Sequence, residues 1–183
     1  MELSRRIAIY APLIALAALA VLVVVLLRYR RLLYEGRQVQ ARRLVALTLS
    51  AWLVVLLAGT LSGGRSDDAL PFDLNPLTMD DPLRVVAAEW LLNVALFVPL
   101  GILLPLLLRR RRVVTTVAVG AALSFVIELT QFTFQLNRDP SVTDIICNTV
   151  GAFLGTLIGV ALQRRTRPPA ELPETDAVQH ASE

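Results

Sequence analysis

Residues 113–162 read VVTTVAVGAALSFVIELTQFTFQLNRDPSVTDIICNTVGAFLGTLIGVAL. The stretch contains two apolar segments, Val113–Phe134 and Thr143–Leu162, separated by a short polar connection. A helix of about 20 apolar residues is long enough to cross the hydrocarbon core of a bilayer. Both segments also carry acidic or amide side chains close to the connection. The stretch therefore predicts two membrane-spanning helices joined by a tight hairpin, with polar groups beside it.

Three further apolar segments precede this pair: Ile7–Leu27, Leu44–Leu61 and Ala87–Leu108. Of the 183 residues, 55% are hydrophobic and only 18% are charged, and the mean hydropathy is +0.62. Soluble domains carry about a quarter charged residues. The composition thus excludes a soluble enzyme, a coiled coil and a disordered chain, and it predicts an all-α integral membrane protein with five transmembrane helices.

The arginines predict the orientation of these helices. All 18 basic residues are Arg, of which 13 fall in the connections on one side and five on the other. Basic residues near the ends of spans favour the cytoplasmic side. We therefore expect the N-terminus outside and the C-terminus in the cytoplasm. Arg109–Arg112 is then a hairpin between two spans, so the basic clusters predict membrane topology and no nucleic-acid partner.

The same patterns suggest a division of the chain into three parts. Residues 1–86 form a two-span N-terminal region with a basic cytoplasmic loop and an acidic outer loop. Residues 87–163 form a three-span core. Residues 164–183 are rich in proline and acidic groups, cannot bury apolar area, and are expected to be a disordered cytoplasmic tail.

Polar side chains inside the last three spans are the candidate functional residues. Intramembrane carboxylates and amides are costly, so they are a functional hypothesis by default. In the expected orientation all of them lie toward the outer leaflet, where they would form a polar pocket. The spanning residues are Glu89, Asn93, Ser124, Glu128, Gln131, Asp144 and Asn148.

Helical spacing places these groups on shared faces. Ser124, Glu128 and Gln131 follow i, i+4, i+7, and Asp144 and Asn148 start a stripe that continues with Gly151 and Gly155. Small residues four apart allow helix backbones to approach closely. We therefore expect the glycines to pack the helices beneath the pocket, while Pro99 and Gly101 interrupt the third span and kink it.

Arg138, in the connection between the last two spans, would lie directly above this pocket. Its guanidinium would pair with Glu128 or Asp144, or bind an anionic group. Three interpretations stay open: polar groups that pair with one another to hold the helices in register, a ligand pocket, or an ion path. The sequence contains no metal-binding or cofactor motif.

These residues resemble the VanZ-like family of bacterial membrane proteins. Asn93 to Gly101 is similar to that family's N-x-x-x-F-x-P-x-G span. The family's S-x-x-x-E-x-x-Q…R…D-x-x-x-N-x-x-G-x-x-x-G signature is matched at Ser124, Glu128, Gln131, Arg138, Asp144, Asn148, Gly151 and Gly155. The two motifs cover about residues 89–160.

The resemblance implies a multi-pass protein of the bacterial plasma membrane and a link to low-level teicoplanin resistance. Two functions fit the pocket best. One is non-catalytic binding of a cell-envelope lipid or lipid-linked molecule, including a lipoglycopeptide. The other is an intramembrane enzyme acting on a cell-wall or lipid precursor, with Glu128 and Asp144 as general base and acid. A transporter is less favoured, because the polar residues end halfway across the membrane.

Overall fold

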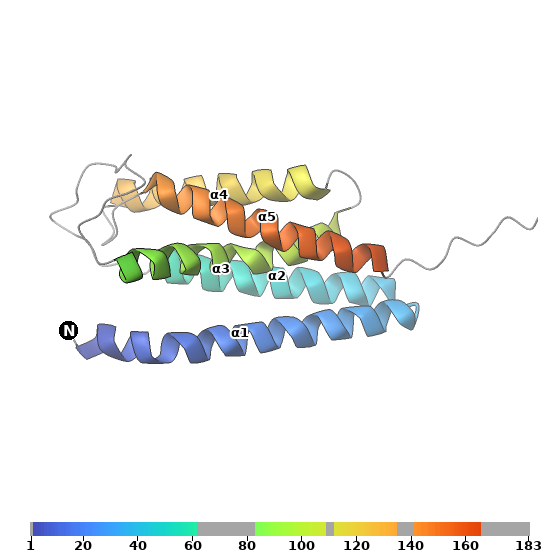
Figure 1. The fold of residues 1–183 in the computed structure, drawn as a ribbon. Helices are drawn as coiled ribbons and strands as arrows, with labels where there is room; N and C mark the ends of the chain where they lie inside the picture. The colour runs from blue at the N-terminus through green and yellow to red at the C-terminus, as the bar shows by residue number, and fades with distance from the viewer. Residues whose placement is uncertain (1, 62–82, 109–111, 135–140, 166–183) are drawn as a thin grey trace, which may run out of the picture.

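The chain folds into five long α-helices (Figure 1). The computed structural model describes residues 2–61, 83–108, 112–134 and 141–165, without the side chains of residues 2–15, 83–86, 88, 89 and 165. The helices are α1 (Glu2–Tyr34), α2 (Gln38–Leu61), α3 (Leu83–Leu107), α4 (Arg112–Phe134) and α5 (Val142–Arg165). The predicted all-α fold is confirmed, and the helices include the five apolar segments of the sequence almost completely.

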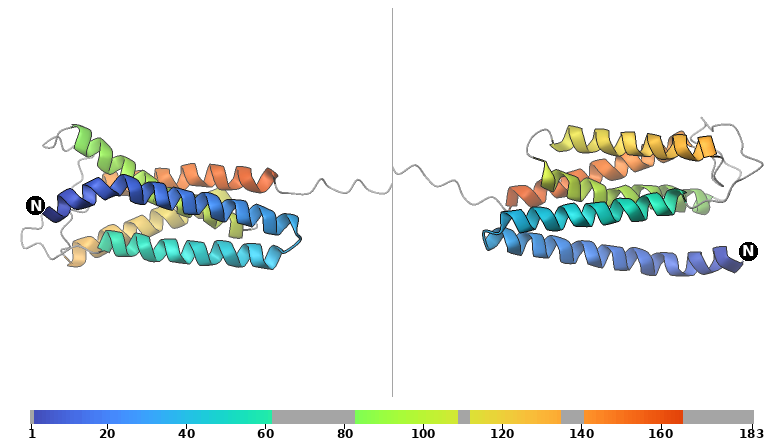
Figure 2. Two further views of the ribbon diagram at one scale, coloured as in Figure 1. Left: turned by 90° about the horizontal axis from the view of Figure 1, so that it is seen from below. Right: turned by 180° about the vertical axis from the view of Figure 1, so that it is seen from behind.

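Successive helices run in opposite directions along the bundle (Figures 1 and 2). The start of α1, the end of α2, the start of α3, the end of α4 and the start of α5 lie at one end. The opposite helix ends, including the end of α5, lie at the other. The predicted disordered tail, residues 164–183, falls almost entirely outside the described residues.

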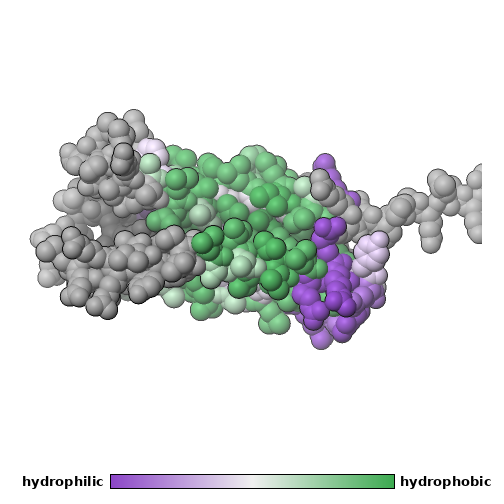
Figure 3. Space-filling model, turned by 60° about the horizontal axis from the view of Figure 1, so that its bottom comes forward, coloured by the Kyte–Doolittle hydropathy of each residue, from purple (hydrophilic) through white to green (hydrophobic). Residues whose placement is uncertain are grey.

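A broad apolar surface surrounds the bundle. Four helices in the described chain are long and apolar enough to cross a membrane: α2, residues Trp90–Leu107 of α3, α4 and α5. Large side chains such as Leu47, Phe125 and Leu154 are exposed along them. Figure 3 shows this apolar band bordered at one end by hydrophilic residues. Such a surface requires a lipid environment, so the chain is a helical membrane protein.

Helix α3 is the centre of the bundle. It packs most extensively against α5 and also contacts α2 and α4. The proline and glycine predicted to interrupt this span, Pro99 and Gly101, do not end the helix: α3 continues as one helix through both Pro99 and Pro105. The Pro99 ring removes the N–H that would bond the carbonyl of Ala95. Next to that position, the indole Nε1 of Trp52 on α2 donates to the carbonyl oxygen of Leu96 (3.0 Å).

Glycines set the close approach of α3 and α5, which run parallel. A Cβ atom on Gly151 would collide with the carbonyl oxygen of Val94, and one on Gly155 with that of Val98. Gly101 is the reciprocal position on α3, where a Cβ would lie 2.9 Å from the Cα of Gly155. The repeat of small residues every four positions thus brings the two backbones into contact, as in small-xxx-small packing between membrane helices.

The turn between α1 and α2 is closed by a glycine cap. Gly36 has a φ of 71°, a conformation that glycine adopts without steric cost. Its N–H donates to the carbonyl of Leu33 (3.1 Å), and the N–H of Arg37 donates to that of Leu32 (2.8 Å). These two bonds form a Schellman motif. The basic segment predicted between the first two spans is therefore mostly helical, with only residues 35–37 between α1 and α2.

Candidate functional site: the polar cluster of α3, α4 and α5

The described residues place most of the candidate side chains together in the interior, toward the end of the bundle where α5 begins. Ser124 is fully buried and Asp144 is half-buried. The exposed fractions of the other four side chains are between 3% and 5%: Asn93, Glu128, Gln131 and Asn148. We call this group the polar cluster: Asn93, Ser124, Glu128, Gln131, Asp144 and Asn148. The side chain of Glu89 and the whole of Arg138 lie outside the described residues.

Two side-chain hydrogen bonds join the three helices. Nδ2 of Asn93 on α3 donates to Oδ1 of Asp144 on α5 (2.6 Å). Nδ2 of Asn148, one turn further along α5, donates to the hydroxyl of Ser124 on α4 (2.9 Å). The stripe predicted on α5 therefore serves two neighbours, because Asp144 contacts α3 whereas Asn148 contacts α4.

The bond between Ser124 and Asn148 also gives the register of α4 against α5. Since the two helices run antiparallel, Glu128 and Asp144 lie at the same level one turn closer to the connection. One turn in the other direction, Gly120 packs so tightly that a Cβ on it would lie 2.6 Å from the Cβ of Ala152. This contact brings α4 and α5 close together below the polar cluster.

Glu128 is held by the first turn of α5. Its Oε2 accepts the backbone N–H of Ser141 (3.0 Å). Ser141 is the N-cap of α5, since its hydroxyl accepts the N–H of Thr143 (3.1 Å). Asp144, in the same first turn, lies where a helix N-terminus stabilises negative charge. Both acidic residues of the cluster are thus positioned at the start of α5: Asp144 lies in its first turn, and Glu128 accepts the N–H of its N-cap residue.

Gln131 reaches away from the other cluster members. Its Nε2 donates to the backbone carbonyl of Thr60 at the end of α2 (2.9 Å). This bond, like that from Trp52, ties α2 to the last three helices. Ser141 was not among the predicted site residues, although the pattern Ser141-x-x-Asp144 is a helix-start signal. No signal along the chain identifies the Thr60 carbonyl, because backbone groups are not encoded by residue type.

One polar atom in the cluster lacks a partner among the described residues. Oδ1 of Asn148 is buried and makes no hydrogen bond there, although Nδ2 of the same amide is bonded to Ser124. Burying a carbonyl oxygen without a partner costs about 1–3 kcal/mol. Among the described residues, the polar cluster therefore has one buried acceptor without a hydrogen bond, one helical turn from Asp144.

Comparison with known proteins identifies the family. The model of the VanZ/LLP1 family matches residues 13–163. The chain belongs to the VanZ/LLP1 family. The VanZ/LLP1 match begins well before the motifs at residues 89–160 and includes all of α2, so family features extend into the first two helices as well.

A curated relative agrees with this assignment. The chain is 35% identical over 83 residues to Protein VanZ of Enterococcus faecium, which is 45% of this chain and 48% of that protein. The matched stretch thus spans about half the length of this VanZ/LLP1 relative. No solved structure matches the chain.

Proposed function

We propose that this VanZ/LLP1 protein crosses the bacterial plasma membrane five times and binds a cell-envelope lipid or lipid-linked molecule at its polar cluster. The observation that carries the proposal is the joining of three apolar helices by polar side chains at one end of the bundle, including buried Glu128 and half-buried Asp144. Such groups are retained in a membrane at a cost of about 2.5–3.5 kcal/mol for a charged side chain at the bilayer centre.

The orientation proposed for the chain places this cluster in the outer leaflet. The arginines at the end of α1, at the start of α2 and at the start of α4 lie at the opposite end of the bundle from the cluster. With those arginines in the cytoplasm, the N-terminus is outside and the C-terminus inside. Residues 87–163 would then supply the binding core, and α2 would support it through Trp52 and Thr60.

A lipid-linked ligand fits the chemistry of the cluster. The free carbonyl oxygen of Asn148 would accept a hydrogen bond from a hydroxyl or amide group of the ligand. Arg138, in the connection between α4 and α5, would add a cation for an anionic group. The match to Protein VanZ of E. faecium agrees with the family resemblance from which the proposed teicoplanin link comes. An acylated glycopeptide would meet the protein at the membrane surface.

Antibiotic susceptibility in a sensitive Gram-positive host tests this function. We expect wild type to protect against teicoplanin but not vancomycin, and Asp144→Asn and Arg138→Ala to lose the protection at equal membrane expression. Thr130→Ala is the matched control, because the Thr130 hydroxyl bonds only the carbonyl of Val126 in its own helix. Absence of protection by well-expressed wild type would contradict the resistance role.

A second candidate function, intramembrane catalysis, is favoured by the position of Glu128 and Asp144 at one level of the bundle. Glu128→Gln separates the two functions. The amide oxygen of Gln still accepts the N–H of Ser141, so the local structure is kept while the proton-transferring carboxyl is removed. Full protection by Glu128→Gln supports binding, and its loss together with retained expression supports catalysis.

A further inference from the structure

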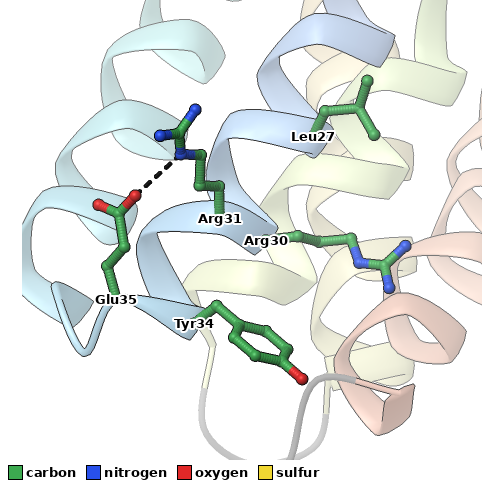
Figure 4. A pocket seen from close by; sticks show the side chains of 5 residues that line it. All are labelled: Leu27, Arg30, Arg31, Tyr34 and Glu35. Atoms are coloured by element: carbon green, nitrogen blue, oxygen red, sulfur yellow. Dashed lines mark hydrogen bonds and ion pairs between the residues drawn. The ribbon is translucent and has the colours of Figure 1, made fainter.

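A shallow hollow lies on the outer face of α1 (Figure 4). It is near the end of α1, at the opposite end of the bundle from the polar cluster. It has a volume of about 470 Å³ and is lined by Leu27, Arg30, Arg31, Tyr34 and Glu35. In Figure 4, Arg30 and Tyr34 point to one side of the helix, whereas Arg31 and Glu35 point to the other. The hollow is thus open and formed by α1 alone, and its two arginines diverge toward opposite edges.

The lining residues follow the helical repeat. Leu27, Arg30, Arg31 and Tyr34 are spaced i, i+3, i+4, i+7, which places them on one stripe of α1. The buried residues Leu22 and Tyr29 lie on the other face, which packs toward the bundle. The stripe therefore faces the surroundings of the protein and is available to a lipid.

Polarity changes along this stripe in the order found in a phospholipid. Val24 and Leu27 are about 60% exposed and apolar, the two arginines follow, and Tyr34 is almost fully exposed. At 1.5 Å per residue, the distance from Val24 to Arg31 along the axis is about 10 Å. An acyl chain would lie on the valine and leucine, a phosphate beside Arg30, and the headgroup beside the tyrosine, which points to the same side as Arg30.

The charges in the hollow leave a cation available. Both carboxylate oxygens of Glu35 are bound, one to Nε of Arg31 (2.9 Å) and the other to Nη1 of Arg37 (3.2 Å). Arg30 makes no ion pair with any described residue and is exposed. An anion beside Arg30 would therefore meet an uncompensated positive charge at the edge of the apolar band.

We propose that this hollow is a binding site for the phosphate headgroup of an anionic phospholipid, with Arg30 as the phosphate ligand. A guanidinium binds phosphate oxygens through two parallel N–H donors. In a zwitterionic headgroup the ammonium group offsets the negative charge of the phosphate, so we expect an anionic lipid to bind more tightly. The site is separate from the polar cluster and does not depend on the function proposed for it. It would anchor α1, which contacts the rest of the bundle mainly through α2.

Lipid titration of the detergent-purified full-length protein tests the site. Bound dioleoyl-phosphatidylglycerol is counted by native mass spectrometry in wild type, Arg30→Gln and Arg43→Gln. Arg43 is the matched control, since it is an exposed arginine at the same end but outside the hollow. We expect Arg30→Gln to weaken binding about fivefold, from about 1 kcal/mol per arginine near a membrane surface, and Arg43→Gln to leave it unchanged.

Two further arms distinguish the ligand and exclude damage to the fold. Dioleoyl-phosphatidylcholine has the same acyl chains and is expected to bind more weakly than dioleoyl-phosphatidylglycerol. Glu35→Gln removes a negative charge and releases Arg31, so it should tighten phosphatidylglycerol binding, a gain that a misfolded variant would not produce. Equal losses in Arg30→Gln and Arg43→Gln, no loss in Arg30→Gln, or displacement of the lipid by an equal concentration of inorganic phosphate would overturn the proposal.

Discussion

The buried amide of Asn148 shows how a single side chain joins two helices inside the membrane. Its Nδ2 bonds Ser124 at 2.9 Å, and both residues are inaccessible or nearly so. Hydrogen bonds between membrane helices contribute on average about 0.6 kcal/mol and at most about 1.7 kcal/mol. The contact is therefore worth more for the choice of partner than for total stability.

Removing the Ser124 hydroxyl tests this contact. We expect Ser124→Ala to lower the free energy of unfolding by about 1 kcal/mol, because the Asn148 amide loses its acceptor in the interior. The measurement is thermal or denaturant unfolding in detergent, combined with Asn148→Ala and the double variant in a cycle. Additive effects of the two substitutions would show that the pair does not interact. Thr130→Ala, whose hydroxyl bonds its own helix, should have a smaller effect.

Glu35 predicts a dependence of stability on pH. The hydrogen bonds from Arg31 and Arg37 lower the pKa of the Glu35 carboxyl below its ordinary value of 4.5. A group with a lowered pKa in the folded state stabilises it above the ordinary pKa and loses that effect as the pH falls through the folded value. Wild type should therefore have a higher unfolding temperature than Glu35→Gln at neutral pH, and the difference should shrink below pH 4.5. A constant difference at all pH values would contradict this explanation.

The pair of α3 and α5 is the element on which the fold depends most. Their backbones touch at Gly101, Gly151 and Gly155, and this contact positions Asn93 against Asp144. The end of α3 is tied in as well. Arg42 on α2 donates to the carbonyl of Leu107 (3.1 Å), and Nε2 of Gln163 on α5 donates to that of Pro105 (2.9 Å). Carbonyls at the end of a helix need such donors.

Alanine at Gly155 tests the close approach. The added Cβ would collide with the carbonyl oxygen of Val98, so the helices would have to separate, at a cost of about 1–3 kcal/mol. Gly59→Ala is the matched control, because nothing lies within 4 Å of a Cβ at that helical position. Alanine is the better helix former by about 1 kcal/mol, so this variant should be as stable as wild type or more stable. Both are compared by unfolding in detergent, and equal stability of Gly155→Ala would contradict the packing argument.

The bundle has two chemically different ends, with the polar cluster near one and most of the described arginines near the other. If the arginine-rich end is cytoplasmic, Tyr34, which is 97% exposed at that end, should be reachable only from inside the cell. We expect Tyr34→Cys, in a background with Cys147→Ser, to resist a membrane-impermeant maleimide in intact cells. The same variant should be labelled in inverted vesicles. Labelling in intact cells would reverse the proposed orientation.

Local properties of the chain were sufficient to predict the helices, their order and the membrane environment. Hydropathy and helical spacing depend only on neighbours along the sequence, which is why the five segments and the stripes through Glu128 and Asp144 could be recognised. The family motifs were found in the same way, and the VanZ/LLP1 match extends them to residues 13–163. The arginine distribution likewise predicts an orientation, which the labelling experiment tests.

The partners of the polar side chains were decided only in the folded bundle. Neither the direction of Gln131 toward Thr60, nor the division of the α5 stripe between Asn93 and Ser124, follows from spacing within one helix. They depend on how each helix is rotated and shifted against its neighbours, and that register comes from the shape of the contact surfaces, above all from glycines that let α5 lie against α3. Sequence periodicity tells which residues share a face, whereas close packing between helices distant in the chain selects what that face meets.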